Sequence, residues 1–496
     1  MRATLRLLAF PAVFVLGLTL FNLQLGQLAL YGFAAVFGLM VLASLRDGPE
    51  GLLAVTIIYL PLNRLYAADL APKLNGTNVL ELLMIAAWIG GAVKGQRTLF
   101  TRRPFTRMVT VWAILSLLSV FTAIAHVGFN EFIWNYTVSL RGFVDQFILF
   151  FLFVNLIRDK NMARRVVVYM MIAATISYLY GFREWFDTRG YTSIEKSRLL
   201  GPVGQPNEYA AFIIYTIAPL LAFAAYYFPR WKSLRLAPVL LRLAPVLLIA
   251  LRVLMGTFSR AAYIALAAEA VGVSWFRSKR LFALLMVALT SVYFFVPSLI
   301  PNSMQARVAQ THQDKTAGGN YDRSSEERLL LWGAAVRMTE ESPIFGQGYG
   351  QFPRLAEDYV SSPTKATDNQ NMYLYVSSDM GLPALASLLI IIAAFALRGR
   401  RLFRRATLDI DRIIGLGAVT MVCGLLVVNM FGTHMIDSAI DGFFWIYAAV
   451  LAHLCVPSAS ANAEKTRPTP LPFTQPAADA EPTTTSAANR RHTTVA

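Results

Sequence analysis

The sequence predicts an all-α polytopic membrane protein with about 12–14 transmembrane helices and one large extracytoplasmic loop. Hydrophobic residues fill 56% of its 496 positions and charged residues only 15%, whereas a soluble protein averages about a quarter charged residues. Apolar segments long enough to cross a hydrocarbon core of about 30 Å recur along the chain. A transmembrane β-barrel would instead show strands of about ten residues with alternating polarity.

The apolar segments follow one another with short polar breaks, and the third of them carries Pro61 and is short enough to be a half-helix. They lie near residues 7–22, 28–45, 50–63, 77–94, 107–126, 140–157, 164–181, 207–228, 237–256, 260–276, 280–298, 371–397, 411–431 and 440–456. Residues 1–6 resemble the start of a signal peptide. No small-residue cleavage site follows them, so we expect an uncleaved first helix.

Basic clusters set the expected orientation. They lie at residues 97–103, 158–165, 230–232, 277–280 and 398–405. The positive-inside rule places all of them in the cytoplasm. Alternating from there puts both termini inside and residues 182–206 and 299–370 outside. The net charge of +16 then reflects membrane orientation, and we expect no nucleic-acid partner.

We expect one transmembrane domain, residues 1–456, that includes the large periplasmic loop 299–370. Residues 457–496 are rich in Pro, Thr, Ala and Ser without apolar periodicity, which predicts a disordered cytoplasmic tail. Cys423 and Cys455, the two cysteines, lie in apolar segments. No His, Cys, Asp and Glu spacing resembles a metal site, so neither a metal nor another cofactor is predicted.

The outer loop 299–370 is expected to form a lid over an active site at the outer membrane face. Residues 324–327 form a capping box that predicts a helix, which must end before Pro343. Arg328 and Arg337 point to opposite faces of that helix at about 100° per residue. Gly346, Gly348 and Gly350 then permit a tight turn or a close approach of backbone to a ligand. A structural turn is the favoured interpretation of the glycines alone.

Several arginines fall at expected outer helix starts or in the loop. These are Arg141, Arg198, Arg260 and Arg328. Arginine suits bidentate contact with phosphate oxygens. The helix expected to begin at Pro206 also presents free N–H groups that attract an anion. The set suggests a lipid phosphate or diphosphate site. Alternatively, the arginines reach the headgroups or pair with Asp145, Glu184 or Glu208.

His434 lies at an expected outer helix end close to Asp437 and Asp441. It is a candidate general base. A histidine whose hydrogen bonds are satisfied at the membrane interface is the commoner arrangement, and both interpretations stay open.

Four pieces of the chain, in this order and on this topology, resemble the O-antigen ligase / O-antigen polymerase (Wzy-like) membrane superfamily. They are Arg198-Leu-Leu-Gly201 with Gln205-Pro206-Asn207, Ser259-Arg260, Arg328 and Trp332 with Pro343 to Phe352, and Asn371-Met-Tyr373-Leu374 running on to Pro383. The resemblance covers roughly residues 30–455 and is closest between Ser197 and Pro383.

The resemblance implies an inverting, metal-independent glycosyltransferase of the bacterial inner membrane. Its donor is a glycan on undecaprenyl diphosphate, and its surroundings are membrane lipid. Partners implied by the pathway are a chain-length regulator and a flippase. The four arginines would clamp the diphosphate and stabilise the leaving group. From the loop, Gly346, Gly348, Gln370 and Asn371 would contact substrate.

Gln370 departs from the family pattern. Ligases of the superfamily typically carry His-Asn where this chain has Gln370-Asn371, and glutamine cannot act as a general base. Polymerase-like members often carry Asp-Asn near this point, and Asp368-Asn369 is close by. We therefore favour a polymerase of glycan repeat units, with Asp368 and His434 as candidate bases. The alternatives are a ligase that transfers a finished glycan to lipid A-core or protein and, in a different class, a transporter or lipid-linked glycan flippase.

Overall fold

The computed structural model of the protein describes residues 48–65, 76–95, 100–101, 103–191, 193–227, 237–295, 323–360 and 368–456. The chain divides into two compact units, Met1–Cys455 and Val456–Ala496, and all described residues except Val456 belong to the first. The predicted segments 7–22 and 28–45 and the predicted tail 457–496 lie outside the described residues.

The predicted fold class is confirmed, because every regular element in the described part of the chain is a helix. Seven of these helices are long and apolar enough to cross a membrane. They are α4 (Gly76–Val93), α5 (Thr106–Val127), α7 (Thr137–Leu156), α8 (Lys160–Thr188), α10 (Pro206–Tyr227), α18 (Leu382–Arg405) and α19 (Asp409–Val428). Further helices at predicted segments are α3 (Pro49–Tyr59), α11 (Ala237–Gly256), α12 (Arg260–Arg277), α13 (Lys279–Phe295) and α20 (Ser438–Leu454).

Local signals set several helix boundaries. The short third segment is an eleven-residue helix, α3, continued by a 3-10 turn, η1 (Leu60–Leu62), that contains Pro61. Helix α10 begins at Pro206 as predicted, since proline suits the first helical position. Helices α8 and α20 follow Asp159 and Asp437, whose carboxylates accept backbone N–H groups at 2.8 Å and 2.9 Å. Such caps satisfy donors that a helix start leaves free.

The single segment predicted for residues 371–397 is wrong in one respect. The structure divides it into α17 (Met372–Met380) and α18, with Gly381 between them at φ 89°. A positive φ of this kind favours glycine, and α17 ends there. The short helices α6 (Phe129–Asn135), α9 (Ile194–Ser197) and α16 (Phe352–Tyr359) were not predicted, because each is too short for a clear apolar period.

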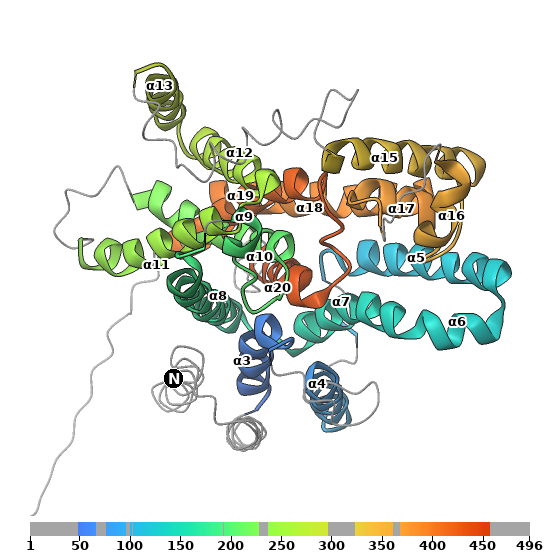
Figure 1. The fold of residues 1–496 in the computed structure, drawn as a ribbon. Helices are drawn as coiled ribbons and strands as arrows, with labels where there is room; N and C mark the ends of the chain where they lie inside the picture. The colour runs from blue at the N-terminus through green and yellow to red at the C-terminus, as the bar shows by residue number, and fades with distance from the viewer. Residues whose placement is uncertain are drawn as a thin grey trace, which may run out of the picture. The chain divides into compact units, whose positions relative to one another are not determined.

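Helices α10, α19 and α20 form the core (Figure 1). Every residue of α20 is buried, and the helix packs against α7, α8 and α10. Helix α19 packs against α10, α12 and α18. The Trp112 ring of α5 stacks on Trp445 of α20 with ring centroids 5.3 Å apart. A helix that is apolar on all sides is expected in this central position.

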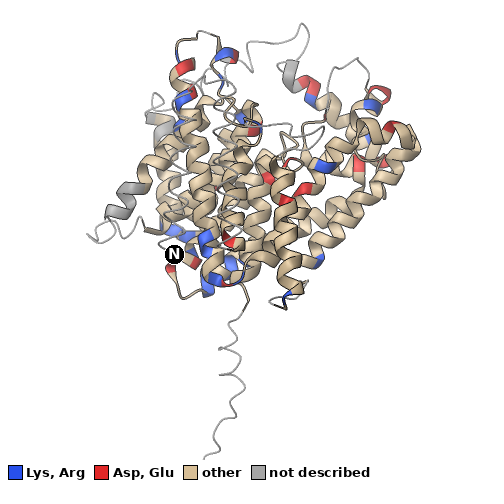
Figure 2. Ribbon diagram, turned by 90° about the horizontal axis from the view of Figure 1, so that it is seen from below, with Lys and Arg blue, Asp and Glu red and all other residues tan. Residues whose placement is uncertain are grey.

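Ion pairs tie together helix ends that the predicted alternation assigns to the same side. At the predicted cytoplasmic ends, Arg164 of α8 pairs with Asp411 of α19 at 2.7 Å, and Arg165 pairs with Glu50 of α3 at 2.5 Å. Figure 2 shows helices that are mostly uncharged along their length, with Lys and Arg gathered mainly near their ends. This distribution is the one expected of membrane-spanning helices.

The predicted outer loop contains a small helical layer with a core of its own. Helix α15 (Arg323–Glu341) ends before Pro343 as predicted, and α16 packs against it. Their shared core consists of Leu331, Ala334, Ala335, Met338, Phe352 and Ala356. Both helices also contact α17 (Figure 1). This layer, α15 and α16, is called the lid below.

Candidate functional site

A small cavity of about 40 Å³ lies where four segments meet. It is formed by the start of α10, the α11–α12 junction, the lid helix α15 and the α19–α20 loop. Its lining residues are Asn207, Phe258, Ser259, Arg260, Ala261, Arg328, Phe431 and His434. The structure therefore brings together two of the four predicted clamp arginines and one of the two predicted bases. Phe258 adopts a left-handed φ of 52°, a strained conformation that proteins often keep at functional sites.

Arg198 supports the wall of this cavity. Its Nη2 donates to Oδ1 of the cavity-lining Asn207 at 2.9 Å, and its Nε donates to the Thr257 carbonyl at 3.0 Å. The backbone just after Arg198 is also held, because the Glu184 carboxylate accepts the N–H groups of Leu200 and Gly201 at 2.9 Å and 2.8 Å. Glu184 thus binds loop backbone and, with these two bonds, helps to position Arg198.

Arg328 reaches the cavity from the lid and is oriented by Gln370. Its Nε donates to the Gln370 Oε1 at 2.7 Å. Next along α15, the Trp332 indole donates to the Asn369 carbonyl at 3.0 Å. Arg337 instead donates to the Tyr359 carbonyl of α16. Arg328 and Arg337 were predicted to point to opposite faces of the helix, and they contact different segments, the Asp368–Asn371 segment and α16.

The segment from Asp368 to Asn371 is held by its own side chains. Asp368 accepts the Gln370 N–H at 3.0 Å on one carboxylate oxygen and the Thr433 hydroxyl at 2.6 Å on the other. Gln370 has a left-handed φ of 50°. The Asn371 side chain caps α17 by accepting from the N–H groups of Tyr373 and Leu374. Asp368 and Asn371 thus shape the segment, and Gln370 presents its amide to Arg328.

His434 is the candidate base that lines the cavity. Its side chain is buried, and burial lowers its pKa from 6.5 to about 4, because a charged imidazolium loses hydration there. The ring is therefore neutral at pH 7 and retains one nitrogen that can accept a proton. A Cβ added at Gly432 would lie 2.1 Å from the His434 Nε2. The absence of a side chain at Gly432 therefore leaves the room that the ring occupies.

Gly346 and Gly348 lie in a turn that packs against backbone. A Cβ at Gly346 would lie 2.3 Å from the Asp379 carbonyl carbon, and one at Gly348 would lie 2.4 Å from the Ala123 amide nitrogen. The Gly348 N–H also donates to the Asp379 carbonyl at 3.0 Å. Neither glycine lines the cavity. The contacts match the structural turn that the glycine spacing favours, and substrate contact stays a prediction.

Arg141 lies on α7 and does not line the cavity. It interacts electrostatically with Asp145 of the same helix and Glu81 of α4, both of which are buried. This is the acid-paired alternative considered for the arginines. The structure therefore separates Arg141 from the other three predicted clamp residues, and its clamp role stays a prediction.

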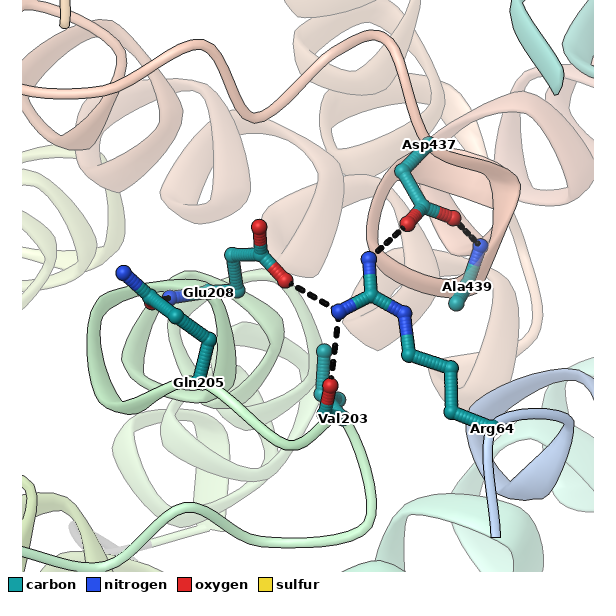
Figure 3. Close-up of polar contacts among 6 residues, drawn as sticks. All are labelled: Arg64, Val203, Gln205, Glu208, Asp437 and Ala439. Atoms are coloured by element: carbon teal, nitrogen blue, oxygen red, sulfur yellow. Dashed lines mark hydrogen bonds and ion pairs between the residues drawn. The ribbon is translucent and has the colours of Figure 1, made fainter. Parts of the chain in front are cut away.

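Sequence reasoning missed Arg64, which follows η1. Its Nη1 donates to the Glu208 carboxylate at 2.6 Å and to the Val203 carbonyl at 2.7 Å, and its Nη2 donates to Asp437 (Figure 3). Burial disfavours its charge, but the two carboxylates outweigh burial and raise the pKa of Arg64. No local motif marks a single arginine whose partners are far away in sequence.

Among the described residues, no group of three or more His, Cys, Asp or Glu side chains is arranged to hold a metal ion. The polar groups of the cavity are instead guanidinium, amide, hydroxyl and imidazole. Guanidinium groups are donors that match phosphate oxygens.

A family model described as O-antigen ligase matches residues 245–389. The matched part runs from α11 into α18 and includes Arg260, Arg328 and Gln370, whereas Arg198 and His434 lie outside it. No curated protein matches the chain. Over residues 245–389 the chain is therefore similar to the O-antigen ligase family, which confirms the resemblance to the O-antigen ligase and polymerase superfamily.

Proposed function

We propose that this protein is a membrane glycosyltransferase of bacterial surface-polysaccharide (O-antigen or exopolysaccharide) biosynthesis. It takes its donor glycan from undecaprenyl diphosphate at the outer face of the inner membrane, and both of its termini are cytoplasmic. One observation carries the proposal: Arg260 of α12 and Arg328 of the lid line the same cavity, and Arg198 bonds to Asn207 of its wall at 2.9 Å.

In this proposal the three arginines bind the diphosphate. The oxygen of an acceptor hydroxyl attacks the anomeric carbon while the bond from that carbon to the diphosphate oxygen breaks, and the lipid diphosphate leaves with the bonding electrons. Fixed guanidinium groups stabilise the negative charge that develops on the leaving oxygen. Because the groups are already oriented by Asn207 and Gln370, little reorganisation is needed during the step.

His434 is the better placed of the two candidate bases for the hydroxyl proton. It lines the cavity, whereas both carboxylate oxygens of Asp368 already accept hydrogen bonds. A bound diphosphate beside the imidazole favours the protonated form, so it raises the pKa of His434 in the complex. Asp368 then acts by positioning Gln370, which in turn orients Arg328.

The cavity must enlarge to admit a glycan. Its volume of about 40 Å³ is far below the roughly 300–1,000 Å³ typical of small-molecule sites. We infer that the lid moves outward when substrate enters. The contacts that hold it in place include the Arg328–Gln370 hydrogen bond, the bond from Trp332 to the Asn369 carbonyl, and the packing of both lid helices on α17.

Polymerisation of repeat units is the leading reaction, because the position that carries histidine in typical ligases is Gln370 here. Transfer of a finished glycan is the second candidate, and the description of the matching family as O-antigen ligase favours it. The two reactions leave different products when the protein is deleted. Loss of a polymerase leaves single lipid-linked repeat units, whereas loss of a ligase leaves long lipid-linked polymer.

The deciding experiment analyses the lipid-linked glycans of a deletion strain complemented with variants. Arg198→Ala, Arg260→Ala and Arg328→Ala are expected to reproduce the deletion phenotype while the protein still inserts in the membrane. Arg337→Ala is the matched control, because Arg337 lies on the same helix as Arg328 but contacts α16. Normal polysaccharide in all three test strains would exclude the diphosphate clamp.

A further inference from the structure

Helix α18 presents one continuous exposed face that changes character along its length. Its large exposed apolar side chains are Leu382, Leu389, Ile390 and Leu397, with exposures of 47%, 41%, 55% and 53%. Spacings of seven or eight residues keep these side chains on one side of a helix. The same exposed side continues with Arg400, Arg401, Arg404 and Arg405. The face is therefore aliphatic for about 22 Å, at 1.5 Å per residue, and then becomes cationic.

The four arginines and Leu397 line a shallow groove of about 210 Å³. Among the residues that the structure describes, none of the four arginines pairs with an acidic side chain, and Arg400 lies over the Phe276 ring at 5.9 Å. The acids next along the chain are engaged elsewhere. Asp409 accepts from the Tyr226 hydroxyl at 2.7 Å, and Asp411 pairs with Arg164. The groove thus carries a concentrated positive charge.

The opposite face of α18 is held against α19, so the arginine face cannot turn inward. A Cβ at Gly399 would lie 2.9 Å from the Gly415 carbonyl oxygen, and one at Gly415 would lie 2.4 Å from the Phe403 amide nitrogen. Small residues at such crossings let helix backbones approach closely. The packing orients the arginines away from the helix bundle, at the level where an apolar span ends.

We propose that this face is a binding site for an anionic phospholipid. The acyl chains lie along the aliphatic part from Leu382 to Leu397, and the lipid phosphate lies in the arginine groove. Guanidinium groups bind phosphate oxygens through paired hydrogen bonds, and basic clusters beside membrane spans bind anionic headgroups. A soluble polyanion would contact only the cationic end, whereas a phospholipid matches both parts of the face. The site is separate from the cavity of Arg260 and Arg328 and does not depend on the proposed function.

The test compares the full chain in phosphatidylcholine nanodiscs that contain increasing fractions of phosphatidylglycerol. The natural chain is expected to bind phosphatidylglycerol in native mass spectrometry and to unfold at a higher temperature as its fraction increases. The variant R400Q/R401Q/R404Q/R405Q is expected to bind it about tenfold more weakly or worse. Its unfolding temperature in pure phosphatidylcholine reports whether it folds. If it does not fold, R401Q/R404Q replaces it and is expected to weaken binding in the same direction.

The matched control is K94Q/R107Q/R158Q/R280Q, which removes the same charge from exposed positions on four different segments at the predicted cytoplasmic side. The control is expected to bind phosphatidylglycerol as the natural chain does. If both variants lost phosphatidylglycerol binding equally, binding would depend only on the general surface charge, and the proposed site would be overturned. An equal rise in unfolding temperature from inorganic phosphate in pure phosphatidylcholine would overturn the lipid assignment.

Discussion

The Nη1 atom of Arg64 lies 2.6 Å from a carboxylate oxygen of Glu208, although 144 positions separate the two residues. The same guanidinium bonds to Asp437 (Figure 3). Glu208 follows the cavity residue Asn207, and Asp437 lies three positions after the cavity residue His434. One arginine outside the cavity thus connects two of the segments that form its wall.

Arg64→Gln is expected to lower the free energy of unfolding by about 1–2 kcal/mol, because it leaves two neighbouring carboxylates without their shared cation. The partly exposed positions of all three side chains, 40%, 29% and 30%, limit the effect through solvent screening. Thermal unfolding in detergent measures it. Arg64→Lys should recover part of the loss, and equal unfolding temperatures for Arg64→Gln and the natural chain would show that the bridge contributes nothing.

Arg328→Ala is expected to lower glycan transfer about 10²-fold or more, the magnitude typical of losing one preorganised donor at a developing charge. Arg337→Ala should leave the transfer rate within about twofold. Polymer formed from a lipid-linked repeat unit by the purified protein is the measurement. If the two variants lose activity equally, Arg328 acts through lid folding and not through the diphosphate.

Gln370→Ala is expected to weaken transfer less than Arg328→Ala, by about tenfold, because it removes the hydrogen bond that orients the arginine and leaves the charge in place. The loss should appear in kcat/KM together with a greater mobility of the Arg328 side chain. Gln370→Glu keeps an acceptor for the Arg328 Nε and should recover much of the rate. No difference between the alanine and glutamate variants would refute the orienting role.

His434 makes stability depend on pH. Its folded pKa of about 4 lies below the ordinary 6.5, so between these values the unfolded chain binds a proton that the native chain does not. The stability that neutral His434 contributes is therefore fully present above pH 6.5 and is lost as the pH decreases toward 4, by about 3 kcal/mol at most. Unfolding temperatures across this range check the slope. His434→Gln should remove this component, and an unchanged slope in the variant would assign it to other groups.

Gly348→Ala is expected to destabilise the protein by at least about 2 kcal/mol. The residue has a φ of 109°, and its added Cβ would meet the backbone of Ala123. Gly142→Ala is the control, since a Cβ in that helical position meets nothing within 4 Å. The control should be neutral or stabilising by up to about 1 kcal/mol. The measurement is the unfolding temperature of each variant, and equal values for Gly348→Ala and Gly142→Ala would refute the packing role of Gly348.

Apolar length and basic flanks determine where most helices begin and end, since hydrocarbon admits only uncharged segments whose backbone bonds are satisfied internally. Pro206 at the start of α10 was also readable, because proline suits the first helical position. The helix predicted to open at residues 324–327 is α15, which begins at Arg323. The break at Gly381 was not predicted, because the apolar residues farther out on both sides outweigh the polar Ser377, Ser378 and Asp379 when the mean hydropathy of one long segment is considered.

The sequence by itself determined that this is an all-α membrane protein, that it carries arginines at the helix ends predicted to lie outside, and that a helix opens near residues 324–327 in the predicted outer loop. Only the tertiary structure decided which arginines meet. Arg260 and Arg328 line one cavity, and Arg198 bonds to Asn207 of its wall. Arg141 lies near buried acidic side chains. Arg64 bonds to two of the segments that form the cavity wall. The reason is physical: helix ends are set by local composition, whereas their neighbours are set by side-chain packing between segments far apart in the chain.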